Sequence, residues 1–353
     1  MFATFADHAD LQDIIFGMFE SFYKANNPDY DAWVLGRNPP KVPVMDTPHT
    51  HLVDCPSRPG ITKKTFDLIG LSRIVRWVRA QKFDVIFFET LHVWNLPIML
   101  FCRKKTRIYQ VIHIVNPFEG EKEGKAVNFM NKVVCKLADC IVVTSPKFIS
   151  GITEKYKISA DKVRYFELLK RFPDYTPPRF TGRVLFFGRM HLYKGVDNLL
   201  KIAKECPNVH FDAVGSVDPF VQDIVDELKK LPNVSMNNGY VSDEEMANAF
   251  INADWILLPY NSAAKSGVVI DAYRYGRPVI AFNVGAIPEQ VRDGVNGYLI
   301  EPGNIAAFCS KLREAVQLDH DSYQKLSKSA YEFGLKEYST AGTVDKFMEF
   351  VTQ

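Results

Sequence analysis

Two cations and two glycines follow one apolar run in the segment VLFFGRMHLYKG, residues 184–195. The run is typical of a buried strand that stops at Gly188, and Lys194 with Gly195 opens a predicted helix. A loop that leads from a strand into a helix directs backbone N–H groups at one point, where anions bind. Arg189 and Lys194 add full positive charges, so we predict that they hold a phosphate group. The alternative is a pair of solvated surface cations.

Two further segments of the second half could complete a nucleotide site. Ser266 and Gly267 begin a predicted helix whose first-turn N–H groups can bind an anion, and Asp271 follows about one turn later. A carboxylate there can accept both hydroxyls of a ribose, although an ordinary anion at a helix start is the alternative. Residues 237–241, NNGYV, end another predicted strand, where backbone groups could contact a base edge.

These segments lie in a series of short apolar strands that alternate with amphipathic helices between residues 180 and 300. The predicted strands are 183–188, 209–215, 233–238, 255–259 and 278–282. Ser242 and Glu245 have the spacing of a capping box, which predicts the start of one helix. Strand, helix and strand at this spacing indicate right-handed crossovers and a parallel sheet, so the second half is predicted to be Rossmann-like.

The first half repeats the pattern less clearly. Its predicted strands are 1–6, 31–36, 84–89, 107–114, 140–145 and 163–166. The fold class is therefore α/β, with two facing Rossmann-like domains and a ligand cleft between them. We expect domains over 1–170 and 182–335, a proline-rich linker over 171–181, and a helical segment over 336–353 that can pack back on the first domain.

The composition excludes several classes of protein. A chain of 353 residues with 47% hydrophobic residues can bury two cores, and its net charge of +2 gives no support to nucleic-acid binding. No run reaches the ~18 apolar residues of a transmembrane helix, and no signal peptide is evident, so we expect a cytoplasmic protein. Six scattered cysteines are typical of reduced core residues.

The order of the motifs from 187 to 304 resembles the second domain of family 4 retaining glycosyltransferases of the GT-B fold. The resemblance implies transfer of a sugar from a UDP- or GDP-sugar to a hydroxyl of a glycan or glycolipid, as in bacterial polysaccharide synthesis. By this resemblance Arg189 and Lys194 hold the diphosphate, Asp271 binds the ribose, Tyr240 and Val241 flank the base, and His113 of the first domain faces the donor sugar. Gly188, Ser266 and Gly267 complete the predicted nucleotide site through their places at the strand end and the helix start.

One departure from the family pattern leaves the donor sugar open. Family members carry two glutamates with seven residues between them, whereas here Ala263 and Asp271 occupy these positions. A nucleotide-binding partner of an active transferase, without activity of its own, is therefore an alternative. An epimerase that acts on a nucleotide-sugar in the same fold is another.

We expect neither a metal nor a cofactor beyond the nucleotide-sugar. Two Asp-x-Asp strings occur, at 29–31 and 319–321, but neither ends an apolar strand, and we interpret both as loop or cap carboxylates. The charge of the diphosphate would then be met by Arg189, Lys194 and helix N-termini.

A basic stretch adds a possible partner. Residues 56–107 hold 11 Lys and Arg against 3 acids. Within 63–82, Arg73, Arg76 and Arg79 fall near one helical face, while Leu68 and its apolar neighbours are available for burial. The segment could be a core-packed helix with a charged outer face, and that face could also bind an anionic membrane surface peripherally.

Overall fold

The structure is a computed structural model that divides into two compact units. It describes residues 1–6, 9–56, 63–113, 124–239, 241–263 and 265–353. The first unit comprises Met1–Arg171 and Ser339–Gln353, and the second comprises Phe172–Tyr338. Each unit contains one parallel sheet with helices, which confirms the predicted α/β fold of two Rossmann-like domains.

The first unit contains a seven-stranded sheet in the order β3-β2-β1-β4-β5-β6-β7. Its strands are β1 (Phe2–Thr4), β2 (Val34–Arg37), β3 (Thr50–Val53), β4 (Val85–Phe88), β5 (Arg107–Val111), β6 (Cys140–Val143) and β7 (Val163–Tyr165). Its α-helices are α1 (Ala9–Ala25), α2 (Leu68–Gln81), α3 (Asn95–Cys102), α4 (Gly124–Leu137), α5 (Phe148–Tyr156) and α13 (Val344–Thr352), and 3-10 turns lie at Lys63–Phe66 and Ala160–Lys162.

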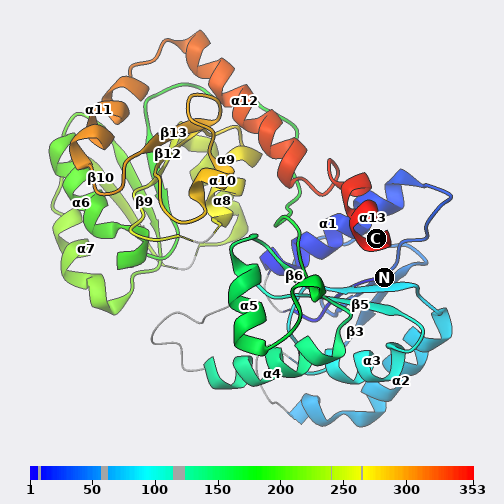
Figure 1. Ribbon diagram of the computed structural model, residues 1–353. Helices are drawn as coiled ribbons and strands as arrows, with labels where there is room; N and C mark the ends of the chain where they lie inside the picture. Colours follow the sequence, from blue (N-terminus) through cyan, green and yellow to red (C-terminus); the bar gives the residue numbers. More distant parts are fainter. Residues whose placement is uncertain (7–8, 57–62, 114–123, 240, 264) are drawn as a thin grey trace. The chain divides into compact units, whose positions relative to one another are not determined.

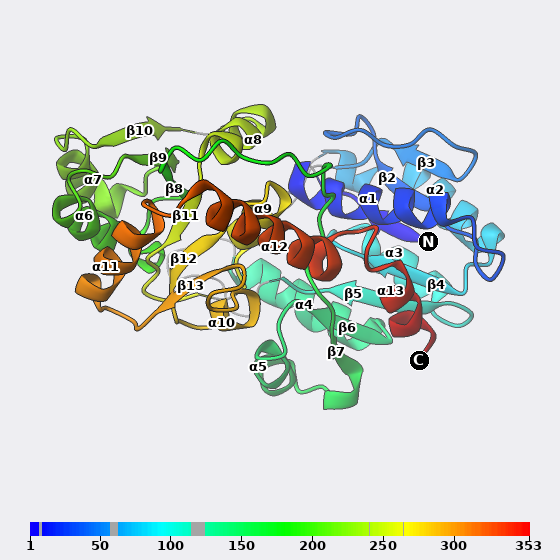
Figure 2. The same ribbon diagram turned by 90° about the horizontal axis from the view of Figure 1, so that it is seen from above.

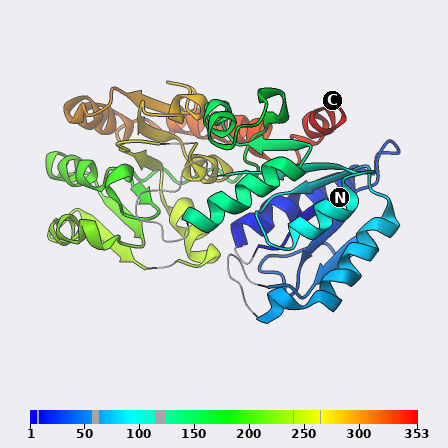
Figure 3. The same ribbon diagram turned by 60° about the horizontal axis from the view of Figure 1, so that its bottom comes forward.

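Helices cover both faces of this sheet (Figures 1 and 3). On one face, Phe16 and Phe19 of α1 and Phe347 of α13 pack with Phe87 of β4 in one apolar cluster. Helices α2 to α5 contribute buried side chains to the core on the other face. Burial of apolar residues on both faces explains why the strands are short continuous apolar runs without alternation.

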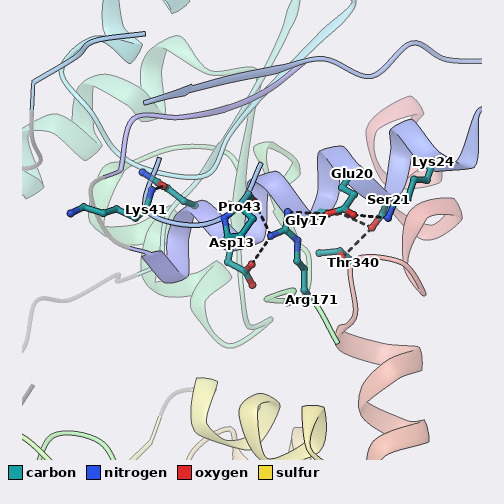
Figure 4. Close-up of polar contacts among 10 residues, drawn as sticks. Asp13, Gly17, Glu20, Ser21, Lys24, Lys41, Pro43, Arg171 and Thr340 are labelled. Atoms are coloured by element: carbon teal, nitrogen blue, oxygen red, sulfur yellow. Dashed lines mark hydrogen bonds and ion pairs between the residues drawn. The ribbon is translucent and has the colours of Figure 1, made fainter. Parts of the chain in front are cut away.

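Both points where the chain passes between the units are fixed to α1 (Figure 4). Arg171 donates from Nη1 to Oδ1 of Asp13 at 3.1 Å, and its Nη2 lies 3.1 Å from Oε2 of Glu20. A Cβ at Gly17 would lie 2.8 Å from Cγ of Arg171 and 3.1 Å from Cγ2 of Thr340. Glycine at this helix position therefore lets the outgoing and the returning segment pack against α1.

The second unit contains a six-stranded sheet in the order β10-β9-β8-β11-β12-β13. Its strands are β8 (Val184–Phe187), β9 (Phe211–Gly215), β10 (Val234–Asn238), β11 (Trp255–Leu258), β12 (Val279–Phe282) and β13 (Gly297–Ile300). Its α-helices are α6 (Val196–Glu205), α7 (Gln222–Leu228), α8 (Asp243–Asn252), α9 (Gly267–Arg274), α10 (Ile287–Gln290), α11 (Ile305–Ala315) and α12 (His320–Tyr338), and 3-10 turns lie at Leu192–Lys194 and Pro219–Val221.

Helices α6, α7, α11 and α12 contribute to the apolar core on one face of this sheet. Helix α12 also lies along α9 (Figure 2), where a Cβ at Gly334 would approach Cβ of Tyr273 to 2.5 Å. The predicted capping box is present at the start of α8, because Ser242 and Glu245 each accept a hydrogen bond from the backbone N–H of the other. Asp319 accepts from the N–H of Ser322 at the start of α12, which agrees with its interpretation as a cap carboxylate.

The proline-rich segment that follows the first unit packs against α12. Tyr331 donates to the carbonyl of Pro173 at 2.9 Å, and Gln324 donates to the carbonyl of Pro178 at 2.6 Å. These contacts place residues 173–178 in the second unit. The expected terminal segment, 336–353, is two helices, since α12 ends at Tyr338 and α13 begins at Val344.

Candidate functional site

The phosphate motif lies at the carboxyl end of β8, as predicted. Gly188 follows this strand with φ +104°, and a Cβ there would lie 2.7 Å from Nζ of Lys194. The ammonium group of Lys194 also lies 5.4 Å from the ring centroid of Tyr260, which follows β11. Glycine is therefore favoured at 188 because the backbone conformation is left-handed, and a side chain there would also displace the Lys194 ammonium from its position.

Arg189 has a protein partner that the sequence analysis did not identify. Its Nη2 lies 2.5 Å from Oδ2 of Asp218, a buried residue in the loop after β9. The backbone N–H of Phe220 and then the Arg189 guanidinium hold the pKa of Asp218 below its usual value, although burial opposes this shift. The arginine is thus held in place, while 53% of its side chain remains exposed for a further contact.

Two asparagines fasten the loops that carry these groups. Asn198 of α6 donates to the carbonyl of Pro259 at 2.9 Å and to Oδ1 of Asn261 at 2.8 Å. Asn261 donates in turn to the carbonyl of Leu192 at 2.7 Å. Gly195, with φ +70°, allows this approach, because a Cβ there would lie 1.8 Å from the carbonyl oxygen of Pro259. An asparagine on the buried, apolar face of an amphipathic helix was the signal that could have revealed this contact.

Helix α9 begins at Gly267, as predicted. The N–H of Ser266 donates to Oε1 of Gln290 at 2.7 Å, and Nε2 of Gln290 donates back to the carbonyl of Ser266 at 3.1 Å. This pair fixes the backbone at the helix start. A Cβ at Gly267 would meet no atom within 4 Å, so open space adjoins the first turn of the helix.

Asp271 lies inside α9 and is buried. Its Oδ1 accepts a hydrogen bond from Nη1 of Arg274 at 3.0 Å. The sequence analysis did not identify this ion pair, although the spacing of three residues on one helix allowed it. The contact of Asp271 with a ribose remains a prediction.

The predicted base-contacting pair is described only in part. Tyr240 lies outside the described residues. Val241 is half-buried and lies three residues beyond the last residue of β10, Asn238.

His113 lies just after β5 in the first unit and contacts Glu89, which follows β4. Nε2 of His113 lies 2.8 Å from Oε1 of Glu89 and 3.1 Å from its backbone carbonyl oxygen. Glu89 is buried, whereas 25% of the His113 side chain is exposed. The sequence predicts both strand ends, but not that β4 and β5 are neighbours in the sheet, so no local signal pointed to Glu89 as the partner of His113.

Gly188, Arg189 and Lys194 therefore lie where β8 ends, and Lys194 lies beside Tyr260 after β11. Ser266, Gly267 and Asp271 lie at and after the start of α9, whereas Val241 follows β10. His113 and Glu89 occupy the corresponding edge of the first sheet. Within the described residues, no group of three or more His, Cys, Asp and Glu side chains could hold a metal ion.

Comparison with known sequences connects the second unit to a family. The family model described as Glycosyl transferases group 1 matches residues 181–317. A protein of Klebsiella pneumoniae, an uncharacterized 41.2 kDa protein in the cps region, is 28% identical over 247 residues, which are 64% of this chain and 68% of that protein. D-inositol 3-phosphate glycosyltransferase of Mycolicibacterium smegmatis is 29% identical over 173 residues, 47% of this chain, but the match spans only 38% of its own length.

Solved structures show the same fold. HepE from Anabaena, in complex with UDP and glucose, superposes with a TM-score of 0.67 at 16% identity, over 100% of this chain and 99% of that one. Sucrose-phosphate synthase from Thermosynechococcus elongatus superposes with a TM-score of 0.68 at 17% identity, over 100% and 98% of the two chains. The predicted GT-B fold is therefore confirmed.

Proposed function

We propose, from the premise that the second unit is a domain of the group 1 glycosyl transferases, that this chain moves a sugar from a nucleotide-sugar to a hydroxyl of a glycan or glycolipid. The reaction would retain the configuration of the anomeric carbon. The observation that carries the proposal is the position of the Lys194 ammonium beside Gly188 at the end of β8. That position is where a strand-to-helix loop binds phosphate groups.

The chemical demand is to stabilise a departing nucleoside diphosphate. The bond between the anomeric carbon and the β-phosphate oxygen breaks, and negative charge grows on the leaving group. Lys194, Arg189 and the N-terminus of α9 would supply fixed positive charge and N–H donors for it, without a metal. Asp218 keeps Arg189 in place before the substrate arrives.

The acceptor hydroxyl forms the new bond on the face that the diphosphate leaves. We expect its proton to pass to an oxygen of the departing phosphate. This route needs no carboxylate nucleophile, and configuration is retained because attack and departure share one face.

His113 is proposed to contact the donor sugar, with Glu89 as the residue that orients its ring. Replacement of Glu89 by Gln removes the charge of this partner and keeps its shape, so we expect kcat to fall roughly tenfold or more. Affinity for the nucleoside diphosphate should stay unchanged, as should the unfolding midpoint. Steady-state kinetics and nucleotide titration measure these values. An unaltered kcat would remove Glu89 from the mechanism.

Calorimetric titration of UDP, GDP and ADP, with EDTA present, tests the nucleotide site. We expect UDP or GDP to bind without a metal. If none of the three binds, the proposal fails. A titration that requires added Mg²⁺ would contradict the metal-independent mechanism.

A second function is favoured by Ala263, where family members carry a glutamate. Its carbonyl oxygen would lie 1.7 Å from a Cβ at Gly285, so its backbone packs directly on the loop after β12. In this second function the chain, which lacks the glutamate side chain at 263, would bind a nucleotide and support an active partner without transferring a sugar itself. Release of nucleoside diphosphate from a sugar donor, dependent on an added acceptor, separates the two functions, since only the transferase shows it.

The acceptor is proposed to be presented at an anionic membrane surface that α2 contacts. Arg73, Arg76 and Arg79 are exposed, as predicted. Leu68 was expected to be available for burial but is 69% exposed, because it lies in the first turn of the helix beside the exposed Ile69. Exposed apolar side chains beside arginines favour contact with lipid headgroups. No described helix is long and apolar enough to cross a bilayer.

Replacement of Arg73, Arg76 and Arg79 by Ala should weaken binding to phosphatidylserine-containing vesicles. Each basic residue near such a surface contributes about 1 kcal/mol, so the loss should reach roughly a hundredfold. Sedimentation with vesicles measures it. The matched control replaces three exposed lysines of α12, Lys325, Lys328 and Lys336, and should bind like wild type. Equal binding of both triple variants would exclude α2 as the contact.

A further inference from the structure

The second unit contains a cavity of about 680 Å³ at the amino ends of its strands. Its wall includes Thr181 and Arg183 before β8, Asn252 before β11, and Arg277 before β12. Lys194 follows the carboxyl end of β8, so the cavity belongs to the opposite edge of the same sheet. It is therefore distinct from the proposed diphosphate site.

The wall of this cavity is strongly basic. Four arginines line it, Arg179, Arg183, Arg274 and Arg277, against one acid, Asp174. Arg183 binds Asp212 at 2.8 Å, and Arg274 binds Asp271 at 3.0 Å, but neither of these carboxylates lines the cavity. Arg179 is exposed at the wall, and it makes no hydrogen bond or ion pair with any part of the chain that the structure describes.

Arg277 adds a buried positive charge. It is 3% exposed and donates to the carbonyls of Phe250 at 2.8 Å and Ile251 at 2.7 Å. These are neutral acceptors, and among the described residues no carboxylate forms an ion pair with it. Asp254, the buried acid nearby, accepts hydrogen bonds from Thr181 and from the N–H of Arg183. A buried guanidinium without an anionic partner is costly, and an anion in the cavity would lower that cost.

Prolines and one tyrosine form an apolar part of the wall, beside the polar Thr176, Thr181 and Asn252. Pro173, Pro177, Pro178 and Tyr275 line it. The carbonyls of Pro173 and Pro178 accept hydrogen bonds from Tyr331 and Gln324 of α12, which hold this side of the wall in place. A largely apolar cavity with a few charged groups suits an organic molecule that one polar group orients.

We infer that this cavity binds a small organic anion through a phosphate or carboxylate group, independently of the proposed nucleotide site. Guanidinium groups recognise both kinds of oxyanion with paired hydrogen bonds, which a lysine cannot form. Arg277 supplies the buried charge, and Arg179 supplies the guanidinium that has no partner among the described residues.

Calorimetric titration at low ionic strength with inorganic phosphate, glucose 6-phosphate and citrate tests this inference. We expect at least one probe to bind, and Arg179→Ala to weaken it about tenfold, the value of one charge-assisted hydrogen bond. Arg277→Gln should weaken it further. Arg179 is exposed, so its variant decides the test even if Arg277→Gln does not fold.

Two controls separate this cavity from other anion sites. Arg313→Ala removes an exposed arginine of the same unit that does not line the cavity, and it should bind the probe like wild type. Lys194→Ala, which alters the proposed diphosphate site, should also leave this binding unchanged. The inference is overturned if no probe binds, if Arg179→Ala binds like wild type, or if Lys194→Ala abolishes binding.

Discussion

Replacement of Lys194 by alanine is expected to lower kcat/KM for the nucleotide-sugar by about 10²–10³-fold, the cost of removing one preorganised group that stabilises a transition-state charge. The fold should tolerate this change, because the ammonium makes no hydrogen bond or ion pair with the described residues and lies over the ring of Tyr260. Steady-state kinetics measures the loss, and titration of the nucleoside diphosphate should show weaker binding.

Lys201→Ala is the matched control for this change. Lys201 lies on α6, is 59% exposed, and its ammonium has Asp197 at 3.7 Å as its ion-pair partner among the described residues. The Lys201→Ala variant loses one positive charge from the same unit, as Lys194→Ala does, and it should retain wild-type kinetics. If Lys194→Ala also keeps wild-type nucleotide affinity, the interpretation of the 184–195 segment is wrong, and the chain shares only the fold of these enzymes.

Replacement of Gly195 by alanine should destabilise the second unit by about 3 kcal/mol, because two costs act at one residue. The left-handed backbone disfavours a side chain, and the new Cβ would lie 1.8 Å from the carbonyl oxygen of Pro259. The loops after β8 and β11 would have to separate, which also displaces Lys194. Urea unfolding followed by circular dichroism measures the loss of stability.

Gly303→Ala separates the two costs. Gly303 has φ +76°, close to the +70° of Gly195, but a Cβ there would meet no atom within 4 Å. The Gly303→Ala variant should therefore lose about 1 kcal/mol of the free energy of unfolding, which is the cost of the left-handed backbone alone. Equal destabilisation of the two variants would contradict the argument from close packing of the loops.

Five of the six strands of the second unit could be predicted, because each local signal agrees with its neighbours. The apolar runs, the capping box before α8 and the glycine before α6 all indicate where strands end and helices begin. The edge strand β13 was not predicted, because Gly297–Ile300 is a four-residue run that starts with glycine and has two half-buried residues in its middle. The predicted strands of the first half also form. The strand β3 was not predicted, because Thr50–Val53 at the sheet edge is half-buried throughout and has neither a continuous apolar run nor a clear alternation.

The partners of the site residues could not be predicted from spacing. Asp218 is separated from Arg189 by a complete helix and a strand, so only the folded sheet brings them together. The same holds for Asn198 with Asn261. The contact of His113 with Glu89 depends on β4 and β5 being neighbours, and the order of strands in a sheet is not written in any local pattern.

The fixed crossing points on α1 bear on how this chain is synthesised. Lys170 and Ser339 lie opposite each other in a parallel bridge, so the second unit is inserted into the first at a single place. A ribosome delivers all of the inserted unit before it delivers α13, whose Phe347 and Phe350 cover the aromatic face of the first sheet. The inserted unit can therefore fold first, while the part of this apolar face that α13 covers beside α1 stays exposed, where a chaperone could bind.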